Sequence, residues 1–384
     1  MLPVLQSEHF LQQFKNLKEK GSHNSYLLTL AALSCGYNVN FHRSQKEADS
    51  KIKRFPADVD EPVFYSINSK RKIVHFTSSR SEHDNLKAHT LSVNKSVLKA
   101  YLSKAGINTP FGGAAKSDNR AILTSLKKAG IDRVSVKPVA GKGSRGVRLN
   151  QTLEQAEAII AENPQDIFIV EQMIQGAEFR ITASKKDVVA AHMIIPAHVV
   201  GDDITTLKDL IEQEVKLRKK NPAFVTRPLD PIKVLESAAA QGVHGSNVLK
   251  KGEIYRLTLD GLPTRAFRTP VLDRLPKQFV DIAKQTVQLI DGVVCGIDVL
   301  ADRSGTPYVL DIDAVSGMWF ECFPHPTGEW NLDVPNYILK HHFPKHKGTQ
   351  RQILSYDFVA LKEELMREGR TTKGVNAADF AVFA

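Results

Sequence analysis

Apolar residues recur along the chain at two spacings, and the alternation between them predicts a mixed α and β structure. Spacings of three and four residues, the period of a helix, occur in five segments: 24–35, 94–105, 153–163, 207–219 and 358–369. Short apolar or alternating runs, typical of strands, occur in seven: 38–43, 134–138, 147–150, 166–174, 176–197, 292–301 and 307–314. The segment 176–197 is long enough for two strands, with a turn around Lys185-Lys186-Asp187.

Two further turns predict β-hairpins. Strand patterns over 63–67 and 72–76 flank a polar INSKRK segment, and those over 292–301 and 307–314 flank DRSGT, with the turn near Ser304-Gly305. Together the elements predict an α+β (α/β) protein. The expected division is a small α/β lobe over 1–88, a main domain over 89–345 and a helical tail over 346–384.

Composition narrows the class of protein. The chain has 384 residues, with 42% hydrophobic and 24% charged, as in ordinary globular proteins, and no apolar run has the length of a membrane helix. The cysteines are Cys35, Cys295 and Cys322, which form no CxxC pair, so a reduced, cytoplasmic setting is expected.

The net charge of +10 raises the question of a polyanionic partner. The densest basic run, 216–220, ends a helical pattern that has Leu207, Leu210, Ile211, Val215 and Leu217 on or near one face. We interpret this run as the solvated end of a helix. No aromatic interleaving or nucleic-acid motif accompanies it, so neither nucleic acid nor membrane is expected as a partner.

A glycine segment, GKGSRG, follows the strand that ends with Lys137 and precedes the strand VRLN. A dinucleotide site would need a helix at that point, and a Walker loop would need Gly-Lys-Ser/Thr, which this segment lacks. The pattern leaves a glycine-rich hairpin that approaches phosphate through backbone N–H groups, or an ordinary turn with surface basic residues. In the first interpretation the phosphate-binding residues are Lys137, Gly141, Lys142, Gly143, Ser144 and Gly146.

Acidic residues suggest the remainder of a nucleotide site; the alternative is that the glutamates are surface residues flanking a turn and the aspartates are exposed residues at a strand edge. Glu171 lies at a strand end, and Glu178, seven residues later, has the two acceptor oxygens that a ribose diol requires. Asp311 and Asp313 lie two apart on one strand and share a face, with Asp298 nearly opposite Asp311 across the hairpin. Three carboxylates on one face repel one another unless a cation lies between them, and oxygen ligands without His or Cys favour Mg²⁺.

Over about residues 89–345 these segments resemble the ATP-grasp superfamily, in particular the ATP-grasp domains of cyanophycin synthetase and bifunctional glutathione synthetase. NKSVLKAYLSKAGINTP resembles the lead-in helix of the family, VSVKPVAGKGSRGV its phosphate loop, and FIVEQMIQGAEFRI its hinge and ribose segment. IIPAHVVGDDITTLKDLIE is similar to a stretch of cyanophycin synthetase. The resemblance implies an ATP-grasp fold, two α+β lobes gripping ATP with the glycine-loop lobe over about 115–178, preceded by the N-terminal α/β lobe.

By position, the resemblance assigns Lys95 and Lys137 to phosphate contact and Glu178 to the ribose. It assigns Glu171, Gln172 and Met173 to the adenine hinge. Arg180 matches an arginine that stabilises charge in the reaction, and Arg256 lies near a phosphate-binding basic position. These assignments imply ATP and Mg²⁺ as cofactors, with one or two ions and Mn²⁺ as an alternative.

The sequence departs from the family in two places. Asp311-Ile312-Asp313 and Ser316-Gly317 replace a usual Glu-x-Asn and Pro-Gly, and TLDGLPTRAFRTP replaces a familiar Asn-x-Ser-x-Gly-Gly segment. The number of metal ions and the acceptor therefore stay open.

The implied activity is ADP-forming ligation of a small-molecule carboxylate to an amine through an acyl phosphate, on amino acid or peptide substrates. A non-amine acceptor, phosphoryl transfer to a carboxylate, or a catalytically silent ATP-binding module are the alternatives, and a homo-oligomer is left open. Structural roles are favoured for His192, His198 and the histidines of 341–346.

Overall fold

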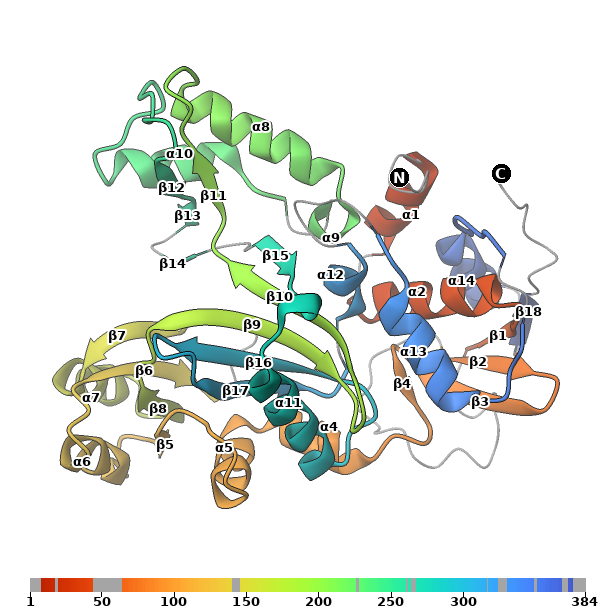
Figure 1. Cartoon of the computed structure of the whole chain (residues 1–384), viewed down its shortest axis with the longest axis horizontal. Coiled ribbons are helices and arrows are strands. Elements are labelled where there is room, and N and C mark those ends of the chain that lie inside the picture. The colour runs from red at the N-terminus through yellow and green to blue at the C-terminus, as the bar shows by residue number, and fades with distance from the viewer. Residues whose placement is uncertain are drawn as a thin grey trace. The chain divides into compact units, whose positions relative to one another are not determined.

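The computed structural model describes residues 8–17, 20–43, 64–139, 146–225, 228–259, 262–263, 267–315, 317–323, 330–348, 351–367 and 372–375 (Figure 1). The chain divides into two compact units. The first unit comprises Met1–Asp84, His192–Pro270 and Gly317–Ala384, and the second comprises Asn85–Ala191 and Val271–Ser316. Within the described ranges, no helix combines the length and apolar character that crossing a bilayer requires.

An antiparallel sheet of five strands lies in the first unit, in the order β18 (Thr372–Val375), β1 (Asn38–His42), β2 (Phe64–Ser69), β3 (Lys72–Thr77) and β4 (Arg80–Ser81). The hairpin of β2 and β3 confirms the prediction from INSKRK. Five helices from both ends of the sequence complete this part: α1 (Glu8–Asn16), α2 (Lys20–Ser34), α12 (Met318–Cys322), α13 (Asp333–His342) and α14 (Phe358–Arg367). Its interior is strongly aromatic, with Phe10, Phe14 and Phe323 packed ring to ring.

The middle segment of the first unit has a hydrophobic core of its own. It contains helices α8 (Leu207–Lys219), α9 (Pro222–Val225) and α10 (Pro231–Ala239). It also contains strands β11 (His198–Val200), β12 (Ile254–Arg256), β13 (Thr258–Leu259), β14 (Leu262–Pro263) and β15 (Phe267–Pro270). Leu207, Ile211 and Val215 of α8 point into the core.

Helix α8 corrects two details of the sequence interpretation. Leu217 is 45% exposed and does not belong to the buried stripe. Arg218, expected to be solvated with the rest of its basic run, is 2% exposed. Its guanidinium lies over the rings of Phe224 and Phe267, 4.7 Å and 5.1 Å from their centroids. The two phenylalanines come from segments that the local helical pattern does not include.

One sheet of the second unit contains the strand that leads into the glycine segment. Its order is β5 (Gly112–Ala115), β8 (Phe168–Gln172), β6 (Arg133–Pro138) and β7 (Arg148–Thr152). Helices α6 (Ala121–Lys128) and α7 (Leu153–Glu162) cover one face, where Val134, Val136 and Val170 join a common apolar core. Because strand residues alternate between faces, Ser135, Lys137 and Glu171 lie on the other face.

A second sheet of the same unit is formed by β9 (Gly176–Ala183), β16 (Cys295–Asp302) and β17 (Pro307–Asp313), with the start of β10 (Val188–Ile195). Helices α4 (Leu86–Val93), α5 (Lys95–Lys104) and α11 (Lys277–Ile290) and a short 3₁₀ turn, η2 (Leu272–Arg274), accompany it. Ile181, Ile297 and Val309 pack with residues of these helices in one core. The turns at 184–187 and 302–306 confirm both predicted strand pairs.

A β-bulge decides which side chains of β17 face the core. Near the turn Val299 pairs with Val309, whereas further along Asp298 pairs with Asp311, so Leu310 is the additional residue. Without it, the register would place Asp311 opposite Ile297, on the apolar face. The bulge therefore turns Asp311 and Asp313 away from the core and onto the face that carries Asp298.

Candidate active site

Glu171 is the centre of a charge network on the first sheet of the second unit. Its side chain is 5% exposed and accepts hydrogen bonds from Lys99 Nζ at 2.9 Å, from Lys137 Nζ, and from Ser135 Oγ at 3.4 Å. Burial alone would raise the pKa of the Glu171 carboxyl. The charges and hydrogen bonds of Lys137 and Lys99 lower it by more, so the net shift of the pKa is downward. A buried carboxylate with two ammonium partners is held ionised.

Helix α5 connects this network to the second sheet. Asn94 caps the helix by accepting from Val97 N–H, which starts the first turn at Lys95. Lys95 and Lys99 are four residues apart, so both project from the same side of the helix. Lys95 pairs with Asp311 of β17, and Lys99 pairs with Glu171 of β8. One helix turn thus brings the charged faces of the two sheets together.

Arg180 ties two of the predicted metal ligands to each other. It lies directly opposite Asp298 in the sheet, and its guanidinium donates to Asp298 at 2.9 Å and to Asp313 at 3.1 Å. To reach Asp313 it passes over Gly296, where an added Cβ would overlap the guanidinium. A side chain at 296 would therefore displace the Arg180 guanidinium, a constraint that the sequence alone did not reveal.

The electrostatics of Lys95 show how near the two networks are. Burial lowers the pKa of its ammonium, and the neighbouring Lys137 lowers it again. Asp298 and Glu171 act in the opposite direction. Lys95 therefore interacts with charges from both sheets, and the basic strand β6 and the aspartate-bearing strands border the same site.

The three aspartates are neutralised by the chain itself. The sequence argument required a cation among them, and Arg180 and Lys95 fill that role. In the described part of the chain no three His, Cys, Asp or Glu side chains are close enough together to hold a metal ion. Asp298 and Asp311, paired across the two strands, still present carboxylate oxygens on one face, which fits a Mg²⁺ ion held by one or two carboxylates plus phosphate oxygens.

Other predicted residues have less evidence in the structure. Gly141, Lys142, Gly143 and Ser144 lie outside the described residues. Gly146, at φ +73°, begins the return into β7. At the hinge, Gln172 N–H donates to Phe111 O and Met173 N–H to Arg133 O, so these two backbone donors are already used. A base bound at this hinge would therefore have to use their carbonyl oxygens.

Of the predicted nucleotide-binding residues, Glu178 lies in the second unit and Arg256 in the first. Glu178 is half-buried on β9, two residues before Arg180 and therefore on the same face of the sheet. Arg256 is exposed on β12 of the first unit, paired across from His198. It belongs to the other compact unit, and the structure does not group it with the charged residues of the second unit.

Lys99 is the main residue that sequence reasoning missed. Its side chain is 8% exposed, burial lowers the pKa of its ammonium, and Glu171 opposes that shift. The signal was present in NKSVLK, because a lysine one helix turn after Lys95 must face the same way. A lysine in a polar-rich helix is ordinarily solvated, so the spacing alone did not distinguish it.

Sequence comparison finds relatives but no matching family model. The chain is 26% identical over 265 residues to the glutathione biosynthesis bifunctional protein GshAB of Listeria innocua, covering 65% of this chain and 34% of that protein. It is 25% identical over 306 residues to cyanophycin synthetase of Crocosphaera subtropica, covering 76% and 34%. The chain thus spans about a third of the length of these relatives.

A solved structure agrees in fold. A bifunctional glutathione synthetase from Pasteurella multocida matches with a TM-score of 0.55 and 19% identity, over 73% of this chain and 40% of that one. The resemblance seen in the sequence and the expected fold class are confirmed: the chain is an α+β protein built on antiparallel sheets, and its fold is similar to that of this glutathione synthetase. More particularly, the chain is similar to the corresponding parts of GshAB and cyanophycin synthetase.

Proposed function

We propose that this chain is an ADP-forming, ATP-dependent ligase that joins a carboxylate to an amine through an acyl phosphate. The observation that supports it best is the position of helix α5. Its Lys95 and Lys99 reach charged partners on both sheets of the second unit, so four cations and four carboxylates gather at one site. Such a site can exchange its internal ion pairs for the phosphates of a nucleotide and a divalent cation.

In this proposal the lysines hold the nucleotide phosphates. Lys95 and Lys137, with exposed fractions of 29% and 23%, are accessible enough to transfer from a carboxylate to a phosphate oxygen. Lys99 and Glu171 are more deeply buried and act as positioning residues that orient Lys137. Glu178 accepts from the ribose hydroxyls, and the hinge carbonyl groups accept from the base amino group.

Asp298 and Asp311 are the residues that would hold Mg²⁺, with Asp313 fixed beside them by Arg180. When bound there, the ion would neutralise charge on the phosphates during transfer. In the chemical sequence, a substrate carboxylate oxygen attacks the γ-phosphorus and ADP leaves. The amine nitrogen then attacks the acyl carbon, loses a proton, and inorganic phosphate leaves. Arg180 stabilises the oxyanion that forms in the second step.

The decisive experiment is an assay of ADP and phosphate release from ATP and Mg²⁺ with a panel of carboxylic acids, with and without amines. Amine-stimulated phosphate release together with an amide product supports the proposal. Release that needs a thiol or hydroxyl compound instead identifies a different acceptor. Tight ATP binding with no turnover for any pair would overturn the ligase proposal in favour of a nucleotide-binding module.

A further inference from the structure

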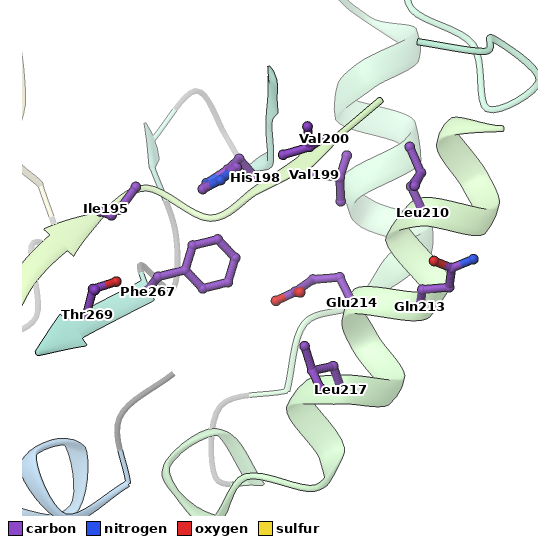
Figure 2. Close-up of a pocket in the computed structure, with 10 residues that line it drawn as sticks. All are labelled: Ile195, His198, Val199, Val200, Leu210, Gln213, Glu214, Leu217, Phe267 and Thr269. Atoms are coloured by element: carbon purple, nitrogen blue, oxygen red, sulfur yellow. The ribbon is translucent and has the colours of Figure 1, made fainter. Parts of the chain in front are cut away.

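The first unit contains a cavity of about 490 Å³ beside helix α8 (Figure 2). Strand β11 and the end of β10 form one wall, β15 another, and α8 a third. Most of the lining is apolar, including Ile195, Leu210, Leu217 and Phe267. Its volume is within the range of sites that bind small organic molecules. The charged network of the second unit contributes no residue to it.

A single carboxylate is the charged group of this cavity. Glu214 projects from α8 into the space that Phe267 and Leu217 border (Figure 2). One turn later, Arg218 donates from Nε to Glu214 Oε1 at 2.5 Å while its own side chain is 2% exposed beneath Phe224 and Phe267. The arginine is enclosed by protein, so a molecule in the cavity meets the carboxylate and not the guanidinium.

The cost of this arrangement indicates a purpose other than stability. Taking both members of an ion pair out of water is costly, and the attraction between them often does not repay that cost. Burial lowers the pKa of the Arg218 guanidinium by more than the hydrogen bond to Glu214 raises it. What the pair does provide is a carboxylate fixed in one orientation on a wall of an apolar cavity.

His198, which lines the cavity together with the polar Gln213 and Thr269, also presents a hydrogen-bond acceptor. His198 Nδ1 lies 2.9 Å from the carbonyl oxygen of Pro196. A carbonyl oxygen only accepts, so Nδ1 carries the proton and Nε2 of the neutral ring is an acceptor. The ring is fixed further by its edge-to-face contact with Phe267, at 4.9 Å between centroids. Sequence reasoning favoured a structural role for His198, and the cavity adds a binding role to it.

We propose that this cavity binds the amine substrate, and that this substrate is a primary ammonium compound with an apolar side chain, of the class of the aliphatic amino acids. The inference rests on the proposed ligase function and names one of its substrates. An ammonium group has three donors and no acceptor, which complements Glu214 and His198. The apolar walls take the side chain. A phosphate or carboxylate would meet the like charge of Glu214, and the side-chain donors beside it are uncharged, from Gln213 and Thr269.

The test uses three probes that separate charge from apolar contact. L-leucinamide has both features, 4-methylpentanamide lacks the ammonium, and L-serinamide lacks the apolar side chain. Titrated into the full chain and followed by calorimetry or ligand-observed NMR, leucinamide is expected to bind more tightly than either of the others by about tenfold or more, since each lacks one favourable contact. Equal affinity for leucinamide and 4-methylpentanamide would overturn the proposal.

Variants place the binding in this cavity. Leu217→Trp fills the space from an exposed position, so it leaves the buried stripe of α8 in place and is expected to weaken leucinamide binding by roughly tenfold. Glu214→Gln removes the charge, but it also leaves Arg218 without its carboxylate, so its folding must be checked. Glu212→Gln is the matched control, an identical change on the same helix outside the cavity lining, and is expected to leave binding unchanged.

Separate readouts distinguish this proposal from the ligase proposal. ATP affinity is expected to be the same in Leu217→Trp as in the parent, because the nucleotide residues lie in the other unit. ATP-dependent ligation with an amine KM that Leu217→Trp does not change would overturn the cavity proposal and leave the ligase standing. Leucinamide binding that Leu217→Trp weakens, without turnover for any carboxylate, would support the cavity and contradict the ligase.

Discussion

The two units bury ionisable side chains in opposite ways. The second unit brings charges together in ion pairs; the members are Lys95, Lys99, Lys137, Arg180, Glu171, Asp298, Asp311 and Asp313. In the first unit, burial keeps imidazoles uncharged and lowers the pKa of His42 and His192 to about 4 and that of His342 to about 3. The second unit gathers its buried charges into one network, whereas the first unit keeps these imidazoles neutral and contains the separate buried ion pair of Glu214 and Arg218.

The difference indicates what each unit is built to do. A network of buried ion pairs is weak evidence for stability, because desolvation cancels much of the attraction. The network instead holds lysine, arginine and carboxylate groups in position, where they can exchange their ion-pair partners for groups of a ligand. Neutral imidazoles in an aromatic core contribute instead to a scaffold that is stable near neutral pH and sensitive to acid. The following experiments test this contrast.

The largest effect is expected from Asp311→Asn. It removes the carboxylate that pairs with Lys95 and that we assign to magnesium. ATP-dependent product formation should fall by about 10³-fold or more, the loss expected for a main electrostatic contributor. Asp302→Asn in the turn of the same hairpin is the control, since Asp302 bonds to Ser304 and Thr306 within that turn. Near-normal turnover of Asp311→Asn with Mg²⁺ as the metal would contradict the assignment.

Glu171→Gln should produce the next largest effect, this time on stability. It leaves Lys99 and Lys137 without their shared carboxylate, and an uncompensated buried charge costs about 3–5 kcal/mol. Faster amide hydrogen exchange in strand β8 measures the loss within the second unit. Adding Lys99→Met should recover part of it by removing the more deeply buried cation. A single-variant cost below about 1 kcal/mol would show that the pair behaves as a solvated one.

Gly296→Ala should lower turnover with little loss of stability. The new Cβ overlaps the Arg180 guanidinium and forces it away from Asp313. Losing one preorganised cationic donor typically costs on the order of a hundredfold in rate. Gly305→Ala is the control with the opposite expectation, a loss of stability with turnover retained. Gly305 has φ +86° in the turn, so an alanine strains that turn without touching Arg180. Equal turnover in the parent and Gly296→Ala would remove Arg180 from the reaction.

Acid should destabilise the first unit before the second. A histidine in the unfolded chain has a pKa near 6.5. Each buried neutral ring therefore contributes its full share to the folding free energy above that pH, and this share is lost as the pH falls toward about 4. The loss is on the order of 1–3 kcal/mol for each ring. Because the pKa of Glu171 is lowered, its network keeps its charge over that window. Both tryptophans, Trp319 and Trp330, lie in the first unit, so their fluorescence reports it selectively.

The acid effect has a specific control. His192→Leu should flatten the pH dependence of the tryptophan signal between about pH 6.5 and 4, because one group that must be charged on unfolding is gone. If the second unit, followed by hydrogen exchange of β8, opens at a higher pH than the first, the contrast between the units is wrong.

Local pattern was sufficient for most of the strands and helices near the site. Alternation placed Asp311 and Asp313 on one face, and the turn at Ser304-Gly305 placed Asp298 opposite Asp311, as the register confirms. The bulge at Leu310 was not foreseen. Its trace in the sequence is the spacing of the two inward residues, Val309 and Ile312, which are three apart where a regular strand requires two.

Residues that depend on distant partners were harder to predict. Lys99 and Arg218 are both cations in helices whose local sequence is polar, and nothing within one turn identifies the residues that enclose them. Glu171 lies 72 residues from Lys99, and Phe267, whose ring contacts the Arg218 guanidinium, lies in a separate strand well beyond helix α8. Enclosure of a charge is a property of tertiary structure, so sequence patterns favour the solvated interpretation by default.

The pairing of β18 with β1 has a consequence for how the protein is made. Val39 lies opposite Val375, and among the strands that the structure describes only β18 covers the outer side of β1, which pairs there once residues 372–375 have been synthesised. A growing polypeptide on the ribosome therefore carries an open strand edge for most of translation, and such edges recruit other chains. Chaperone capture of the nascent chain, and aggregation during rapid expression, should both concentrate on β1.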